Sequence, residues 1–264
     1  MNKPRALAMW CLCGVLQTAT AQNLGDLLDL VKGTSQDEET AMGRQIAGSL
    51  LGAAPLMPDR ALQDYVNQVG RWVASQGERP ELTWHFGVIA SDDVNALSMP
   101  GGHVYLTGGL YRLLKSEAEL AGVLGHEIAH VVRRHHLKLL QQGKVVDLGS
   151  RLFAKQAGEN ETVKKLIGSG AEVMARALDK QAEFEADRMG VVLAARAGYD
   201  AFGLPDVLQK IGRYGTDDGA VALLFKTHPA PGERLDQLAA AMGDRFDAVK
   251  GVSLAERLYR LPAK

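Results

Sequence analysis

The chain has 264 residues, which is enough to bury a substantial hydrophobic core in one domain, or in one domain with an appendage. With 46% hydrophobic and 23% charged residues, its composition is that of an ordinary globular protein. The formal net charge of -1 provides no basic surface, so nucleic acid is excluded as an expected partner.

The first 21 residues have the organisation of a secretory signal peptide. Its parts are a positive start at Lys3 and Arg5, an apolar run over residues 6–16, and the small-residue signal Ala19-Thr20-Ala21. We therefore expect export and cleavage after Ala21, which leaves residues 22–264 as a single domain. No later stretch approaches the roughly 18 apolar residues of a membrane span.

Both cysteines, Cys11 and Cys13, lie inside this signal peptide. The mature chain is therefore expected to contain no disulfide and no thiol chemistry. Lipidation of Cys13 is the alternative. The neighbouring Trp10 and Leu12 argue against it, because they are not small and the apolar run continues beyond them.

The first half of the mature chain is expected to mix helix and strand. Residues 22–40 are polar and are expected to form a loosely held segment. Apolar side chains at helical spacing then predict a core-packing helix over residues 59–76. Aromatic and β-branched residues predict a strand over 82–90, and a turn at 99–102 precedes a second strand over 103–107.

The second half is predicted to be helical. Ser116 to Glu119 match a capping box, so a helix should begin at Ser116 and continue to about Gln141. Further helical pieces are expected over residues 143–180 and 181–197, and beyond them with breaks at 214–219 and 227–229. Helices dominate, with a small sheet beside the helix that begins at Ser116. The predicted fold class is α+β.

The strongest signal is His126-Glu127-Ile128-Ala129-His130, inside this predicted helix. Residues i and i+4 project from one helix face, so the two histidines can hold one ion. Zinc accepts imidazole ligands and leaves a position open for water. Glu127 is adjacent, and is expected to take the proton of the attacking water and pass it to the leaving amine.

Two histidines are too few for a tight zinc site, so a further ligand is needed. Glu183 and Asp187 are four residues apart on a predicted helix, where they share a face. Acidic residues also favour the first turn of any helix, because they complement its dipole. Spacing leaves both interpretations open.

With these motifs, the chain resembles a known family, the zinc metallopeptidases that include HtpX and the CAAX prenyl proteases. Within it, the chain is most similar to the soluble periplasmic branch typified by the β-barrel assembly-enhancing protease. The resemblance covers roughly residues 85–240. It rests on ordered matches at Asn95-Ala96 with Pro100 to Leu110, Gly125 to His130, Glu183 to Arg188, and His228-Pro229.

The resemblance implies a mainly helical zincin-type metalloprotease domain that binds one zinc ion per chain. Glu183 would be the third zinc ligand, and Asp187 would accept a hydrogen bond from a ligating histidine. His228 and Arg234 match a late histidine and arginine of the family. There they would steady the tetrahedral oxyanion, or His228 would fill the open position on zinc as a switch. A merely structural loop role for His228 is the third alternative.

The resemblance also implies a substrate-binding strand. An extended substrate would add its backbone to the rim formed by His103, Val104, Tyr105 and Leu106, with Asn95 nearby. One departure is Asp179-Lys180, where the family commonly has Ser-Arg. The membrane spans of the prenyl proteases and a C-terminal helical-repeat domain are also not expected in this chain, so prenylated substrates are not expected either.

The other histidines are expected to have structural roles. On one continuous helix, His135 would lie about 180° from His126 and face away from the metal. Residues 133–136 would then form a basic helix end that complements the dipole. His85 and His103 are expected to be packing or surface residues.

The expected function is that of a periplasmic zinc metalloendopeptidase acting on misfolded or unassembled cell-envelope proteins. Its expected partners are unfolded polypeptides, with peripheral association with the outer membrane left open. The main alternative is a holdase or assembly factor that grips extended chains with little cleavage. Glu127 argues against it, because binding needs no general base. Metal storage is a weaker third alternative.

Overall fold

A computed structural model describes residues 34–143, 178–215 and 218–262. The predicted signal peptide and most of the predicted helical stretch over 143–180 lie outside these residues. Within the described part, no helix is long and apolar enough to cross a membrane. From Glu39 onward the chain forms one compact unit.

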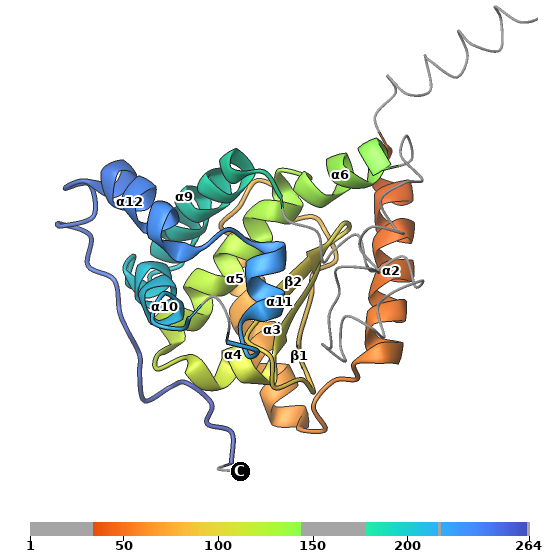
Figure 1. The fold of residues 1–264 in the computed structure, drawn as a ribbon, viewed down its shortest axis with the longest axis horizontal. Helices are drawn as coiled ribbons and strands as arrows, with labels where there is room; N and C mark the ends of the chain where they lie inside the picture. Colours follow the sequence, from red (N-terminus) through yellow and green to blue (C-terminus); the bar gives the residue numbers. More distant parts are fainter. Residues whose placement is uncertain (1–33, 144–177, 216–217, 263–264) are drawn as a thin grey trace, which may run out of the picture. The chain divides into compact units, whose positions relative to one another are not determined.

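A mixed sheet of three strands lies inside this unit (Figure 1). The strands are β1 (His85–Ile89), β2 (Ala96–Met99) and β3 (His103–Thr107). Their order is β1-β3-β2, with β1 parallel and β2 antiparallel to β3. The strands predicted over 82–90 and 103–107 are confirmed, whereas β2 is a strand that the sequence patterns did not predict.

The turn between β2 and β3 is also confirmed. Gly101 and Gly102 have φ values of 76° and 96°, a left-handed conformation that only glycine adopts without strain. The backbone N–H of Gly101 donates to the buried carboxylate of Glu39 at 3.2 Å. The glycines of the motif therefore allow the tight reversal that starts β3.

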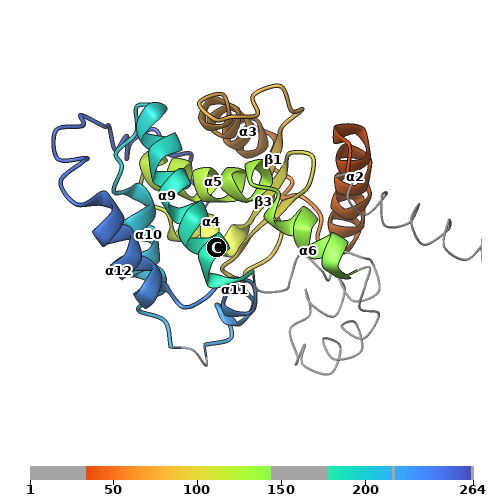
Figure 2. The same ribbon diagram turned by 90° about the horizontal axis from the view of Figure 1, so that it is seen from above.

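Side chains on the two faces of the sheet pack into two hydrophobic clusters. One face packs against α3 (Arg60–Ala74) and α5 (Glu117–Val132). The other contacts Ile46 and Leu50 of α2 (Gln36–Ala53). Figure 1 and Figure 2 show the sheet between α5 and α2. Successive residues point to opposite faces of a strand, so Val104 and Leu106 join the first cluster and Tyr105 the second.

Helix α3 confirms the helix predicted over 59–76 and also closes one edge of the sheet. Asp59 caps it by accepting a hydrogen bond from Leu62 N at 3.0 Å. The side chain of Gln63 bonds both backbone groups of Val88 on β1, at 2.9 and 3.0 Å. Asn67 accepts a hydrogen bond from Phe86 N at 3.0 Å. The outer edge of β1 is thus occupied by side chains.

Helix α5 starts as predicted but ends early. Ser116 is its N-cap and accepts a hydrogen bond from Glu119 N at 3.1 Å. The helix ends at Val132, and α6 (His135–Gly143) starts after a break. Arg134 has φ 56°, a left-handed conformation that interrupts the helical hydrogen bonds. The prediction of one helix as far as about Gln141 is therefore wrong.

Helix α9 (Lys180–Arg196) confirms the helix predicted over 181–197. The helical pieces predicted beyond it are α10 (Gly203–Ile211), α11 (Ala222–Thr227) and α12 (Pro231–Met242), which are separated at the predicted breaks, and a short helix α4 (Gly108–Leu113) follows β3. Helix α9 packs closely on α5, because Gly125 and Gly190 face each other and a Cβ on Gly125 would lie 2.7 Å from the Gly190 carbonyl oxygen. Asp179 caps α9. Helices surround a small sheet, which confirms the α+β class.

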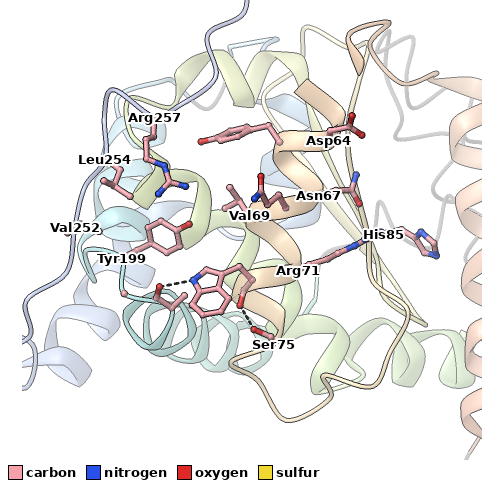
Figure 3. Close-up of a pocket in the computed structure, with 15 residues that line it drawn as sticks. Asp64, Asn67, Val69, Arg71, Ser75, His85, Tyr199, Val252, Leu254 and Arg257 are labelled. Carbon is pink, nitrogen blue, oxygen red and sulfur yellow. Dashed lines mark hydrogen bonds between the residues drawn. The ribbon is translucent and has the colours of Figure 1, made fainter. Parts of the chain in front are cut away.

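A cavity of about 1280 Å³ lies between α3, the end of α9 and the segment that follows α12 (Figure 3). Tyr65, Tyr199 and Arg257 line it, and all three contact the buried carboxylate of Glu117. None of the residues predicted for the metal site or for catalysis lines this cavity. Its described contacts account for the attachment of the C-terminal segment to α5.

Candidate metal centre

Four buried side chains from three parts of the chain converge on one point. His126 and His130 lie one turn apart on α5, Glu183 lies in the first turn of α9, and His228 follows α11. One ligand atom of each lies within 4.8 Å of the others. The Nε2 atoms of His126 and His130 are 3.0 Å apart. Three imidazoles and a carboxylate, none more than 5% exposed, fit a four-coordinate zinc ion.

The protonation of His130 and Glu183 also suits a metal. Burial, followed by the neighbouring histidines, lowers the pKa of His130 well below its ordinary value, so its imidazole is neutral and can ligate. Burial alone would raise the pKa of Glu183. His228 and Arg234 outweigh it and lower that pKa to about 2, so the carboxylate is charged. His228 Nδ1 lies 2.9 Å from both carboxylate oxygens of Glu183.

Asp187 lies one turn beyond Glu183 and contacts His126. The distance from His126 Nδ1 to Asp187 Oδ1 is 2.9 Å. The other contacts of this carboxylate come from Arg234, which donates from Nη2 to Oδ1 at 2.6 Å and from Nε to Oδ2 at 2.9 Å. Asp187 is therefore clamped by a bidentate guanidinium while it contacts the ring of His126.

Arg234 has partners that spacing did not predict. It is buried, it pairs with Asp187, and its Nη1 lies 3.5 Å from Glu183. Its guanidinium thus contacts both the candidate ligand Glu183 and Asp187, the partner of His126. This geometry gives Arg234 a role in holding Asp187, in addition to the oxyanion role expected from the resemblance.

Among the described residues, the buried carboxylate of Glu127 is incompletely paired. Its side chain is buried, Oε1 lies 3.9 Å from His228 Nε2, and Oε2 has no hydrogen-bond partner among the described residues. Buried polar atoms in folded proteins are almost always paired, so an unpaired carboxylate oxygen needs an explanation. A small cavity of about 40 Å³ adjoins Glu127, His126 and His228 and is otherwise lined mainly by aliphatic side chains.

The prediction that residues 103–106 form an open rim for substrate is wrong. Strand β3 is the central strand, and its residues pair with β1 on one side and with β2 on the other. A substrate backbone therefore finds no free edge there. Among the described residues, the unpaired edge belongs to β2, whose first residue Ala96 lines the cavity beside Glu127. The sequence patterns predicted no strand at β2, so they did not show that β3 is covered on this side.

Asn95, also predicted to contact substrate, immediately precedes β2. It is buried, and its Oδ1 accepts a hydrogen bond from Thr227 Oγ1 at 3.3 Å, next to His228 in the chain. Its Nδ2 has no partner among the described residues. The side-chain amide thus retains free donors beside the candidate metal centre.

The predicted orientation of His135 is wrong as well. Its Nδ1 lies 2.9 Å from His130 Nδ1, on the side of the ring opposite the metal ligands. His136 is buried beside it, so the two histidines pack inside the protein and are not part of the basic helix end expected over residues 133–136. The side chains of Arg133 and Arg134 form ion pairs instead. The spacing argument did not predict the contact of His135 with His130, because it placed both residues on one unbroken helix.

His85 and His103 lie apart from the candidate metal centre. Their registered positions on β1 and β3 stack the two rings, with centroids 4.7 Å apart. His103 is buried, which confirms the expected packing role. Burial, followed by the neighbouring charges of His85 and Arg44, lowers its pKa to about 4.

The family described as "Peptidase family M48" matches residues 60–242. The β-barrel assembly-enhancing proteases of Escherichia coli strain K12 and Yersinia pestis are 33% and 32% identical over 211 residues. These matches cover 75% and 76% of this chain, but 42% and 43% of the relatives. The mitochondrial metalloendopeptidase OMA1 of Arabidopsis thaliana is 31% identical over 160 residues, covering 61% of this chain and 32% of the relative. The chain thus spans less than half the length of these relatives.

Proposed function

The chain belongs to peptidase family M48, and from this premise we propose that it is a zinc metalloendopeptidase that cleaves unfolded or misassembled polypeptides. The observation that carries the proposal is the convergence of His126, His130, Glu183 and His228 beside a buried, unpaired Glu127 oxygen. A purely structural metal site would not need a free carboxylate beside it, whereas hydrolysis of a peptide bond needs a base at this position.

Zinc, when bound, supplies a Lewis acid that activates water and polarises the peptide carbonyl. The unpaired Oε2 of Glu127 is the group that takes the proton from the attacking water. The same carboxyl group then returns the proton to the leaving amine. Asp187 and Arg234 keep the ring of His126 in one orientation during this cycle.

The edge of β2 is the proposed docking place for the substrate backbone. An extended chain that pairs with β2 would pass Ala96 and so reach the cavity beside Glu127. Backbone pairing tolerates varied side chains, which suits a protease for misfolded proteins. The free Nδ2 of Asn95 would donate to a substrate carbonyl at the start of this edge.

The proposed role of His228 is that of a switch, which holds the enzyme inactive by filling the open position on zinc. As a fourth ligand beside His126, His130 and Glu183, an imidazole supplied from a segment between two helices would complete the site and exclude water. Activation would then require this segment to move. The alternatives are an oxyanion role, supported by its position beside Glu127, and a role limited to the loop.

The cell envelope is the proposed location. The predicted signal peptide supports export to the periplasm, and the names of two of the relatives refer to β-barrel assembly. Misfolded or unassembled envelope proteins are therefore the proposed substrates, with the outer membrane as a place of peripheral association. Protein from the envelope fraction should begin near Gln22. Intact Met1 in the cytosol would contradict export, and a lipid on Cys13 would indicate an anchored lipoprotein instead.

The decisive experiment compares Glu127→Gln with wild type. Zinc content and cleavage of an unfolded protein are measured for both, with Glu256→Gln as a control at an exposed glutamate. Glu127→Gln should keep about one zinc per chain and lose cleavage, because the amide binds no proton in this role. Cleavage by Glu127→Gln at the wild-type rate would refute the mechanism. Binding of unfolded protein without cleavage by zinc-loaded wild type would favour the holdase.

A further inference from the structure

The break between α5 and α6 brings a histidine back toward the metal site. On a continuous helix, His135 would point about 140° away from His130, because five residues turn the helix by about 500°. The left-handed backbone of Arg134 redirects the chain, and α6 starts with His135 against the ring of His130. An ion pair between Arg134 and the buried Glu39 holds this corner, with Nε 3.1 Å from Oε2.

The donor and the acceptor in the contact between His130 and His135 follow from the atom of His130 that would bind zinc. His130 Nε2 faces His126 Nε2 and the carboxylate of Glu183, so Nε2 is the atom that would bind zinc. A neutral imidazole that binds through Nε2 carries its proton on Nδ1. With zinc on Nε2, that proton would point along the 2.9 Å line to His135 Nδ1, so His130 would donate and His135 would accept.

The ring of His135 is oriented by a contact with Glu185. If Nδ1 of neutral His135 accepts, its proton is on Nε2, which lies 3.5 Å from Glu185 Oε2. Glu185 is held from its other oxygen by Arg133, whose Nε lies 2.9 Å from Oε1. Arg133 also forms two hydrogen bonds with Glu78. A chain of contacts thus runs from His130 to the surface of the protein.

We propose that His135, oriented by Glu185, is a positioning residue that fixes the ring and tautomer of the zinc ligand His130. Partners of this kind orient metal ligands, and their loss typically weakens metal binding by about 10- to 100-fold. The inference rests on the zinc site of the proposed function, but not on peptidase activity. His126 and His130 would then each have a partner on Nδ1, Asp187 for the first and His135 for the second.

The neighbouring His136 provides a matched control. It lies on the same helix and is 7% exposed, compared with 6% for His135. Its ring also lies near that of His130, with centroids 5.5 Å apart. However, no hydrogen bond to His130 is formed, and its Nδ1 has no partner within the described part of the chain. Loss of a buried imidazole can thus be separated from loss of the contact to the ligand.

The test measures zinc affinity by competition with a chelator in His135→Leu, His135→Asn, Glu185→Ala and His136→Leu. Asparagine keeps an acceptor, Oδ1, close to the position of Nδ1. We expect His135→Leu to bind zinc at least about tenfold more weakly, His135→Asn to recover most of this loss, and His136→Leu to stay within about twofold of wild type. Glu185→Ala should lose several-fold. The visible spectrum of the cobalt-substituted protein should change in His135→Leu and not in His136→Leu.

Thermal unfolding of each metal-free variant separates loss of the fold from loss of zinc. The inference is overturned if folded His135→Leu binds zinc as wild type does, or if His136→Leu loses as much affinity as His135→Leu. If His135→Leu does not fold, wild-type affinity in Glu185→Ala together with a full loss in His135→Asn overturns it. Failure of wild type to bind zinc would refute the proposed metal site itself, which is a different outcome.

Discussion

Asp187 provides the sharpest test of how the metal site is held. Its carboxylate is 1% exposed and lies between the guanidinium of Arg234, which is 4% exposed, and the ring of His126. Replacing Asp187 with alanine leaves the buried charge of Arg234 without its bidentate partner. Breaking a buried ion pair from one side typically costs about 3–5 kcal/mol. Because Glu183 lies 3.5 Å from Arg234 and compensates in part, we expect the low end, about 3 kcal/mol.

The assay is urea unfolding of the metal-free protein, so that zinc binding does not contribute to the free energy of unfolding. The exposed pair Arg60–Asp64, with side chains 94% and 73% exposed, is the control, and Asp64→Ala should cost less than about 0.5 kcal/mol. Replacing Asp187 and Arg234 together with leucine should recover much of the loss, because no buried charge is left unpaired. A cost for Asp187→Ala no larger than that of Asp64→Ala would refute the reasoning.

The other predictions concern the metal, the switch and pH. Glu183→Ala should lose zinc and cleavage, as measured by metal content and by an unfolded substrate, and normal zinc content would exclude Glu183 as a ligand. His228→Ala should raise basal cleavage with zinc retained if His228 is a switch, whereas a fall in turnover would favour the oxyanion role and no change the loop role. The pKa of His103 in the folded protein is about 4, below its ordinary value of 6.5. Between pH 4 and pH 6.5 the unfolded chain therefore binds more protons than the folded protein. The free energy of unfolding should consequently fall as the pH is lowered from 6.5 to 4. His103→Gln should remove on the order of 1–2 kcal/mol of this acid sensitivity, seen as a flatter dependence of Tm on pH; parallel curves for variant and wild type would contradict it.

Local sequence signals predicted the parts of this protein that depend on neighbouring residues. The spacing of His126 and His130 places both on one helix face, whatever surrounds the helix. The cap at Ser116 and the turn at Gly101-Gly102 were predicted for the same reason, because a cap or a turn is built from a few consecutive residues. The resemblance to a family, carried by ordered motifs, pointed to Glu183 and His228 at positions where spacing left alternatives open.

Tertiary structure decided which strand is central and where His135 points. Strand order depends on long-range pairing, and no local pattern distinguishes a central strand from an edge strand when both are short and buried. The end of α5 depends on one left-handed residue, Arg134, which is held by Glu39 from a distant helix. That single backbone angle converts His135 from a residue facing away from the metal into a partner of His130. Contacts between residues far apart in the chain select such conformations, and a local sequence pattern does not contain them.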